Sequence, residues 1–185
     1  MNTYATIILL TLLVEYFLSL VADRLNLGTL GKGIPREFEG MIDGEAYEKS
    51  QSYTRVKTNF GIIASTFSLM VTLIFWIFGG FNWLDNFVRG WQLGMLWSGL
   101  VYIGILLLAK SVLSLPFSMY STFVIEERFG FNKTTPTTFI LDIVKGLFLG
   151  LVLGAPLLLG VLAFFEFAGP LAWLYCWAAA TLFLL

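Results

Sequence analysis

Long apolar stretches without a charged side chain limit what this chain can fold into more than any other feature. Four of them carry no charge, over residues 58–84, 90–109, 146–165 and 167–185. A fifth, residues 3–22, contains only Glu15. A helix needs about 20 mostly apolar residues to cross about 30 Å of hydrocarbon, so each stretch is long enough, or nearly so, to span a membrane. With 58% hydrophobic and 12% charged residues, the chain cannot bury five such stretches in a soluble core.

We therefore predict an all-α, polytopic membrane bundle that forms a single membrane domain over residues 1–185, with amphipathic helices in its cytoplasmic loops. The predicted spans cover about residues 3–22, 60–81, 91–113, 144–165 and 170–185. The first is interpreted as an anchor, not a cleaved signal peptide, because Met1-Asn2-Thr3 lacks a basic side chain. The fifth span reaches Leu185 without a polar stop, so we expect it to be truncated.

Basic residues predict the orientation. The loops after the first and third spans, with their flanks, hold ten of the eleven lysines and arginines, so the positive-inside rule places these loops in the cytoplasm and the amino terminus outside. In the first loop, Asp43 is expected to cap a helix that runs into the second span, because no proline intervenes. A short turn at residues 82–90, flanked by Trp83 and Trp91, is expected to mark one membrane face.

A polar and aromatic segment, Pro116–Pro136, separates the third and fourth spans. Apolar positions at helical spacing over residues 117–129 predict an amphipathic segment, at the membrane surface or folded back into the bundle, after a kink or break at Pro116. Gly130 is expected to end this segment. Thr135 is then expected to cap the next helix, with Pro136 as its first residue.

Two features within the spans also call for interpretation. Gly146, Gly150 and Gly154 follow one another at four-residue steps, which predicts close packing against a neighbouring helix. Glu15 lies about two thirds of the way through the first span, where a carboxylate is costly unless it faces a cavity, has a partner or reaches water. Glu15 is therefore a candidate intramembrane acid, and an interfacial acid in contact with water is the alternative.

The side chains that carry most hydrolytic chemistry are missing. The chain has no histidine and a single cysteine, Cys176, so we expect no catalytic residue and no metal site in it. Glu126 and Glu127 are adjacent and would point about 100° apart on a helix, which does not suit a metal. A solvated helix end is the simpler interpretation of this pair. A net charge of −1 without a basic patch argues against a nucleic-acid partner.

Three motifs in order carry a family resemblance: Leu115-Pro116 with Tyr120-Ser121-Thr122-Phe123-Val124-Ile125-Glu126-Glu127, then Gly130-Phe131-Asn132-Lys133, then Phe139 to Lys145 with Asp142. A weaker set precedes them: Pro35-Arg36-Glu37-Phe38, Gly40, Glu45, Tyr47, Lys49-Ser50 and Tyr53. Together they resemble the type I CAAX prenyl endopeptidases, which are membrane zinc metallopeptidases, and their bacterial relatives, and we expect a bacterial-like member. The resemblance covers the amino-terminal membrane region of such an enzyme.

The resemblance implies a role in enclosing an intramembrane chamber and bracing a catalytic zinc domain expected after residue 185. Zinc would be the cofactor of the full-length parent, because the family's His-Glu-x-x-His ligands are absent here. The implied partners are the lipid bilayer, the parent's own catalytic domain, and protein or peptide substrates. The residues implied to face the chamber or the catalytic domain are Glu127, Arg128, Phe129, Phe131 and Asn132.

The implied location is an integral membrane position, in the bacterial cytoplasmic membrane or, in a eukaryote, the membrane of the endoplasmic reticulum. A non-enzymatic membrane module, either a transporter element or a scaffold, is the alternative function. Glu15 and the glycine-rich fourth span are the features that fit transport.

Overall fold

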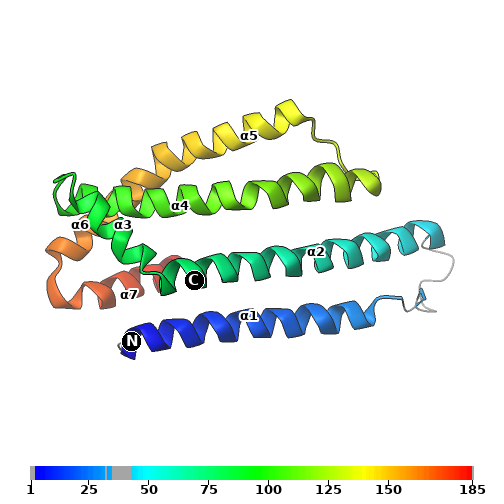
Figure 1. The fold of residues 1–185 in the computed structure, drawn as a ribbon, viewed down its shortest axis with the longest axis horizontal. Helices are drawn as coiled ribbons and strands as arrows, with labels where there is room; N and C mark the ends of the chain where they lie inside the picture. The colour runs from blue at the N-terminus through cyan, green and yellow to red at the C-terminus, as the bar shows by residue number, and fades with distance from the viewer. Residues whose placement is uncertain (1–2, 32, 35–42, 185) are drawn as a thin grey trace. The chain divides into compact units, whose positions relative to one another are not determined.

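The computed structural model describes residues 3–31, 33–34 and 43–184, and within them every regular element is a helix (Figure 1). Four helical runs are long and apolar enough to cross a membrane: Thr3–Thr29, Gly44–Ile77, Met95–Glu126 and Pro136–Phe167. The shorter helix over Ala172–Leu182 is also apolar. The all-α membrane architecture expected from the sequence is confirmed.

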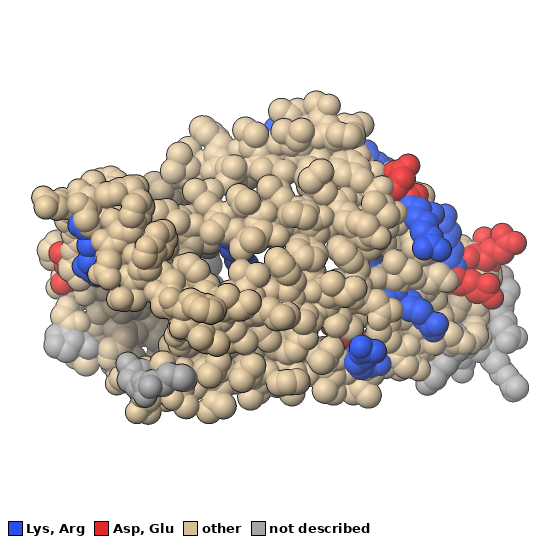
Figure 2. All heavy atoms as spheres, viewed as in Figure 1, with Lys and Arg blue, Asp and Glu red and all other residues tan. Residues whose placement is uncertain are grey.

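The surface of the described residues is largely apolar. Four hydrophobic side chains are buried there, namely Leu84, Val88, Ile125 and Ala172, and many large apolar side chains along the long helices are exposed. Residues other than lysine, arginine, aspartate and glutamate make up most of the visible face in Figure 2. In a bilayer, such side chains contact lipid tails, which are as apolar as they are.

The chain divides into two compact units, each of which is described by itself. Unit 1 consists of Met1–Phe78 and Val112–Lys133, and unit 2 consists of Gly79–Ser111 and Thr134–Leu185. Helix α4 (Met95–Tyr120) contributes residues to both units.

In unit 1, α1 (Thr3–Thr29) and α2 (Gly44–Ile77) lie side by side, as Figure 1 shows. The hydroxyls of Tyr16 and Thr66 lie 2.7 Å apart and link the two helices within their apolar parts. At the polar end, the backbone N–H of Gly31 donates to the side-chain oxygen of Gln51 over 2.6 Å. These contacts tie α1 to α2 at two levels.

The start and course of α2 agree with the sequence analysis. The side chain of Asp43 accepts a hydrogen bond from the backbone N–H of Glu45 at 3.1 Å, which satisfies one free amide of the first turn. The helix then continues without a break from polar residues into the apolar stretch and ends at Ile77. Gly79 follows with φ 72°, a left-handed conformation that suits glycine.

The expected turn at residues 82–90 is instead a helix, α3 (Gly80–Arg89), in unit 2. Leu84 and Val88 are one helical turn apart and only 4% and 1% exposed, so together they form its buried face. Trp83 and Phe87 lie exposed on another face with their rings stacked 5.7 Å apart. The prediction of a simple turn was wrong because four-residue spacing of apolar side chains gave this short segment a face to bury.

The segment after Pro116 continues α4 and is not a separate amphipathic element. The helix passes through Pro116 and leads directly into a π-helical turn, η2 (Ser121–Glu126). A proline removes only one backbone hydrogen bond, and a long apolar helix tolerates that loss. Gly130 ends the run as expected, with φ 68° and its N–H donating to the carbonyl oxygen of Glu127 at 2.9 Å.

The rest of unit 2 begins at the predicted cap. The hydroxyl oxygen of Thr135 accepts a hydrogen bond from the N–H of Thr138 at 3.2 Å, and Pro136 is the first residue of the helix. The elements that follow are α5 (Pro136–Leu149), the π-helical turn η3 (Gly150–Gly154), α6 (Ala155–Phe167), the 3-10 turn η4 (Gly169–Leu171) and α7 (Ala172–Leu184).

The glycine pattern of the fourth span does not produce close packing within the described residues. No atom of another element lies within 4 Å of the position that a Cβ would occupy at Gly146, Gly150 or Gly154. Close approach occurs instead at Gly99, where a Cβ would lie 3.1 Å from the side chain of Leu162. A glycine only permits close approach, and a side chain must still lie opposite it.

Candidate functional site

An aromatic cluster lies where the segment after η2 meets the polar part of α2, within unit 1. The ring of Tyr53 packs edge-on against Phe129 at 5.5 Å and against Phe131 at 4.8 Å between centroids. Edge-to-face packing is the geometry that aromatic pairs prefer. Phe129 and Phe131, two of the site residues predicted from the sequence, thus both pack against Tyr53 of α2.

An ion pair borders this cluster. The ammonium group of Lys57 lies 3.1 Å from a carboxylate oxygen of Glu126 and donates a 2.7 Å hydrogen bond to the hydroxyl of Tyr53. The Glu126 side chain is 26% exposed, so it is not the solvated helix end expected from the sequence. The ammonium group of Lys57 and the hydroxyl of Tyr53, which donates to the same carboxylate oxygen at 3.5 Å, hold Glu126 against α2.

The hydrogen bonds that Lys57 donates, first to Tyr53 and then to Glu126, raise the pKa of its ammonium group above the ordinary lysine value. Lys57 lies outside the apolar part of α2, which begins at Phe60. Because the pKa of Lys57 is higher in the folded than in the unfolded protein, its charged form stabilises the fold. This contribution is complete below the ordinary lysine pKa and is lost only as the pH rises through the raised pKa. Lys57 therefore stays protonated across neutral pH.

A third side chain of α2 reaches the same segment. The ammonium group of Lys49 lies over the ring of Phe131, 5.3 Å from its centroid, in a cation–π contact. Lys49, Tyr53 and Lys57 follow one another at four-residue steps, so they share one face of α2. We call these three residues, with Glu126, Phe129 and Phe131, the α2–η2 cluster.

Sequence reasoning missed the α2 side of this cluster. In the sequence, Lys49 and Tyr53 stand out only as part of the weaker motif, and Lys57 belongs to neither motif. Their four-residue spacing just before an apolar span was the available signal, but nothing in the sequence named the segment they would meet. Of that weaker motif, Pro35 to Phe38 and Gly40 lie outside the described residues.

A hydrogen bond between two side chains links the start and the end of the segment after η2, residues 127–132. The amide nitrogen of Asn132 donates to a carboxylate oxygen of Glu127 at 2.9 Å, and its backbone N–H donates to the carbonyl of Glu126 at 3.2 Å. Glu127 and Asn132, two more of the predicted residues, therefore contact each other. The Glu127 side chain remains exposed.

The π-helical turn fixes which side chains face α2. A π turn inserts one residue, and one residue corresponds to about 100° of rotation on a helix. With this register, Ile125 is 3% exposed and Glu126 faces Lys57. Upstream, Phe60 packs against Tyr120 at 4.8 Å between ring centroids, which joins α2 to the end of α4.

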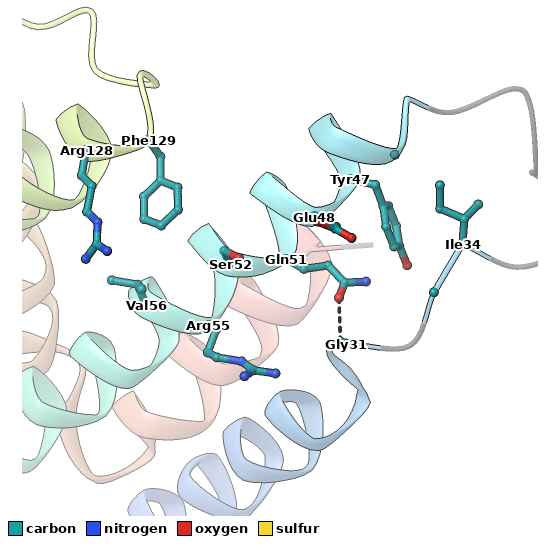
Figure 3. Close-up of a pocket in the computed structure, with 12 residues that line it drawn as sticks. Gly31, Ile34, Tyr47, Glu48, Gln51, Ser52, Arg55, Val56, Arg128 and Phe129 are labelled. Carbon is teal, nitrogen blue, oxygen red and sulfur yellow. Dashed lines mark hydrogen bonds between the residues drawn. The ribbon is translucent and has the colours of Figure 1, made fainter.

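The fifth predicted residue, Arg128, lines a pocket together with Phe129. The pocket has a volume of about 990 Å³, and Figure 3 shows it bounded by α2, the segment after α1 and the segment after η2. Its remaining lining residues are Gly31, Gly33, Ile34, Gly44, Tyr47, Glu48, Gln51, Ser52, Arg55 and Val56.

Glu15 stands apart from this site. Its side chain is exposed on α1, and the structure shows no partner for it among the described residues. The adjacent Tyr16, not Glu15, makes the polar contact with α2. Whether Glu15 serves as an intramembrane acid stays a prediction.

The side chains present do not fit a zinc ion. The whole chain has no histidine, and its one cysteine, Cys176, lies on α7. Across residues 3–31, 33–34 and 43–184, no three histidine, cysteine or acidic side chains come together as a metal site would require. What this arrangement does offer is a rigid, charged and aromatic junction at the polar ends of membrane helices.

Reversing one charge should expose the contribution of the ion pair. We expect Glu126→Lys to lower the stability of unit 1 by about 1 to 2 kcal/mol, because a partly exposed attraction becomes a repulsion from Lys57. Thermal unfolding in detergent measures this loss. The double variant Lys57→Glu with Glu126→Lys should regain most of it, and a double variant no more stable than Glu126→Lys would show that the pair contributes nothing.

The comparisons with known proteins agree with this architecture. A family model described as CAAX prenyl protease N-terminal, with five membrane helices, matches residues 23–185. A CAAX prenyl protease 1 homolog from rice is 30% identical over 151 residues, covering 78% of this chain and 36% of the relative. CAAX prenyl protease 1 from Saccharomyces cerevisiae is 32% identical over 143 residues, covering 72% and 32%.

The fold is similar to that of a solved structure. The crystal structure of S. mikatae Ste24p matches with a TM-score of 0.82 and 26% identity, over 98% of this chain and 45% of the solved chain. The chain thus spans about a third of the length of the curated relatives named above. These relatives come from eukaryotes, and they give no support to the expectation of a bacterial-like member.

Proposed function

We propose that this chain, which belongs to the CAAX prenyl protease N-terminal family, forms membrane helices that enclose the reaction chamber of a zinc endopeptidase and brace its catalytic part. The observation that carries the proposal is the α2–η2 cluster. It builds a rigid junction from the motifs in which the family resemblance lies, at the polar ends of the spanning helices.

The chemistry of bond cleavage belongs to residues outside this chain. The chain has no histidine and spans about a third of the length of its curated relatives, which supports zinc ligands and a general base in another part of the protein, the catalytic part that the resemblance implies after residue 185. Zinc is then a cofactor of the whole protein and not of these 185 residues.

The bracing surface consists of the predicted site residues whose side chains are exposed. Glu127, Arg128 and Phe131 are exposed although Phe131 also packs against Tyr53. The hydrogen bond between Asn132 and Glu127 holds this surface in one shape. The catalytic part packs on it, and the pre-formed shape lowers the ordering cost of that contact.

The membrane context extends the proposal. The protein is an integral multi-pass membrane protein, and its basic loops face the cytoplasm, which places the amino terminus outside. The membrane is the cytoplasmic one in a bacterium or that of the endoplasmic reticulum in a eukaryote. The substrates are proteins or peptides with prenylated tails, as the names of the relatives indicate.

Asn132 tests the bracing role. In the intact protein that contains this chain, we expect Asn132→Ala to lower peptide turnover about tenfold, because small displacements at a supporting surface are costly in catalysis. The folded yield should stay near that of the wild type. Lys133→Ala, a neighbouring exposed position, serves as the control.

The comparison between turnover and yield decides the outcome. Turnover falling further than folded yield supports bracing, and equal losses of both would leave Asn132 with a purely structural role. Asn132→Asp is a second test of the same contact. It places a carboxylate beside that of Glu127, so it should lower turnover at least as much as Asn132→Ala does.

A further inference from the structure

Helix α3 presents a row of aromatic side chains on the surface of unit 2. The rings of Trp83 and Phe87 stack 5.7 Å apart, and Trp91, just beyond the helix, packs edge-on against Phe87 at 5.4 Å between centroids. Their side chains are 64%, 48% and 50% exposed, in that order. We call these three residues the α3 aromatic row. The buried face of α3, with Leu84 and Val88, lies elsewhere on the helix, so the row takes no part in that contact.

The polar side of α3 lies almost opposite the aromatic row. Asp85 and Arg89 each stand two residues from Phe87, which corresponds to about 200° of rotation on a helix. A carboxylate oxygen of Asp85 lies 2.7 Å from the Nε atom of Arg89, so the two charges pair with each other. They are the only charged residues of α3. The helix is therefore amphipathic, and its polar side carries no net charge.

The neighbouring helices keep α3 at one membrane face. The helix before it, α2, ends at Ile77, and α4 begins at Met95, and both are long and apolar enough to cross a membrane. With its ten residues, α3 is about 15 Å long, half of the roughly 30 Å of hydrocarbon that a spanning helix must cross. The hydroxyl of Tyr102 in α4 donates to the backbone carbonyl oxygen of Phe81 at 3.4 Å, which ties the start of α3 to α4.

The chemistry of the aromatic row suits the boundary between headgroups and hydrocarbon. The row carries two indole rings, and an indole prefers this level because its body is apolar and its N–H is polar. The exposed side chains of Met95 and Trp97 follow the row in the first turn of α4. Exposed apolar side chains of a spanning helix contact lipid. The row is thus continuous along the chain with a lipid-facing surface, which favours lipid as its occupant over a soluble protein.

We propose that α3 is an interfacial helix, whose aromatic row enters the boundary between lipid headgroups and acyl chains while its polar side faces water. An amphipathic helix of this kind buries its apolar face about 5 to 10 Å into that boundary. Because Asp85 and Arg89 neutralise each other, apolar and aromatic contacts hold the helix there, and anionic lipid is not required. This inference goes beyond the proposed function and stands whether or not the protein is a peptidase.

Power-saturation electron paramagnetic resonance of the intact protein in phosphatidylcholine nanodiscs tests this proposal. Single cysteines are spin-labelled in a background from which the native cysteines, including Cys176, have been removed. Labels at Trp83→Cys and Phe87→Cys should be accessible to oxygen, at a depth of about 5 to 10 Å in the membrane. The matched controls, Asn82→Cys and Asn86→Cys, lie one residue earlier and should be accessible to a water-soluble nickel chelate. Adding phosphatidylglycerol to the nanodiscs should leave both results unchanged.

Three outcomes would overturn the proposal. Equal access of the nickel chelate to both pairs of labels would place the aromatic row in water. Labels at positions 83 and 87 that neither reagent reaches would place the row against protein, such as a second copy of the chain. Immersion that appears only with phosphatidylglycerol would contradict the neutral polar side. Monodisperse elution on size exclusion confirms that each variant is folded, and two label positions keep the test decisive if one variant is not.

Discussion

We expect Tyr53→Ala to lower the stability of unit 1 by about 2 to 3 kcal/mol. The substitution removes the two edge-to-face ring contacts, with Phe129 and Phe131, each worth about 0.5 to 1.5 kcal/mol beyond area burial. It also removes the hydroxyl that accepts a hydrogen bond from Lys57. Thermal unfolding in detergent should show the midpoint falling by roughly 5 to 10 °C.

Tyr53→Phe is the matched control, because it keeps both ring contacts and deletes only the hydroxyl. We expect it to cost about 1 kcal/mol, the usual value of one hydrogen bond. If Tyr53→Ala were no more destabilising than Tyr53→Phe, the aromatic contacts would not hold the segment after η2 against α2. The α2–η2 cluster would then not be the rigid junction on which the proposed function depends.

Val88→Asp should have the largest effect on folding in unit 2. Val88 is 1% exposed, so the new carboxylate would be buried without a partner, at a cost of several kcal/mol. We expect folded, monodisperse protein to fall to a small fraction of the wild-type yield. Fluorescence-detected size exclusion of membrane extracts measures that yield directly.

Asn86→Asp provides the comparison for Val88→Asp, because it adds the same charge two residues away on the exposed face of α3. We expect its yield to stay near that of the wild type. Equal yields for the two variants would mean that α3 does not bury the face that carries Val88.

The sequence was sufficient to predict the spanning helices and several of their ends. Charge-free stretches determine where a helix can cross hydrocarbon, so the bundle follows from composition and spacing alone. Local chemistry at single residues likewise predicted the cap at Asp43, the stop at Gly130 and the cap at Thr135. Each of these depends on side chains within a few residues of one another.

Features that depend on distant partners were not predicted. The α3 helix forms because Leu84 and Val88 have a surface to pack on, and the sequence does not show that surface. The helix α4 passes through Pro116 and leads into a π-helical turn, and nothing in the local sequence predicts either feature, because a membrane helix can tolerate a proline when its surroundings allow it.

The sequence indicated the residues on one side of the candidate site, and their functional role stays a prediction. The resemblance indicated five residues between positions 127 and 132. In the structure, Asn132 donates a hydrogen bond to Glu127, and the rings of Phe129 and Phe131 pack against Tyr53. The other side lies on α2, more than 60 residues earlier in the chain, and no local pattern links Lys57 to Glu126. The sequence likewise gave no sign that Arg55 and Arg128 would line the same pocket.

Peptide cleavage by the intact protein tests the central claim most directly. A peptide with a prenylated carboxyl-terminal C-a-a-X sequence is incubated with purified protein, and the products are followed by mass spectrometry with and without a zinc chelator. The account predicts cleavage that the chelator abolishes and added zinc restores. Folded protein that leaves the peptide intact, or cleavage that the chelator does not affect, would contradict the assignment of this chain to a zinc endopeptidase.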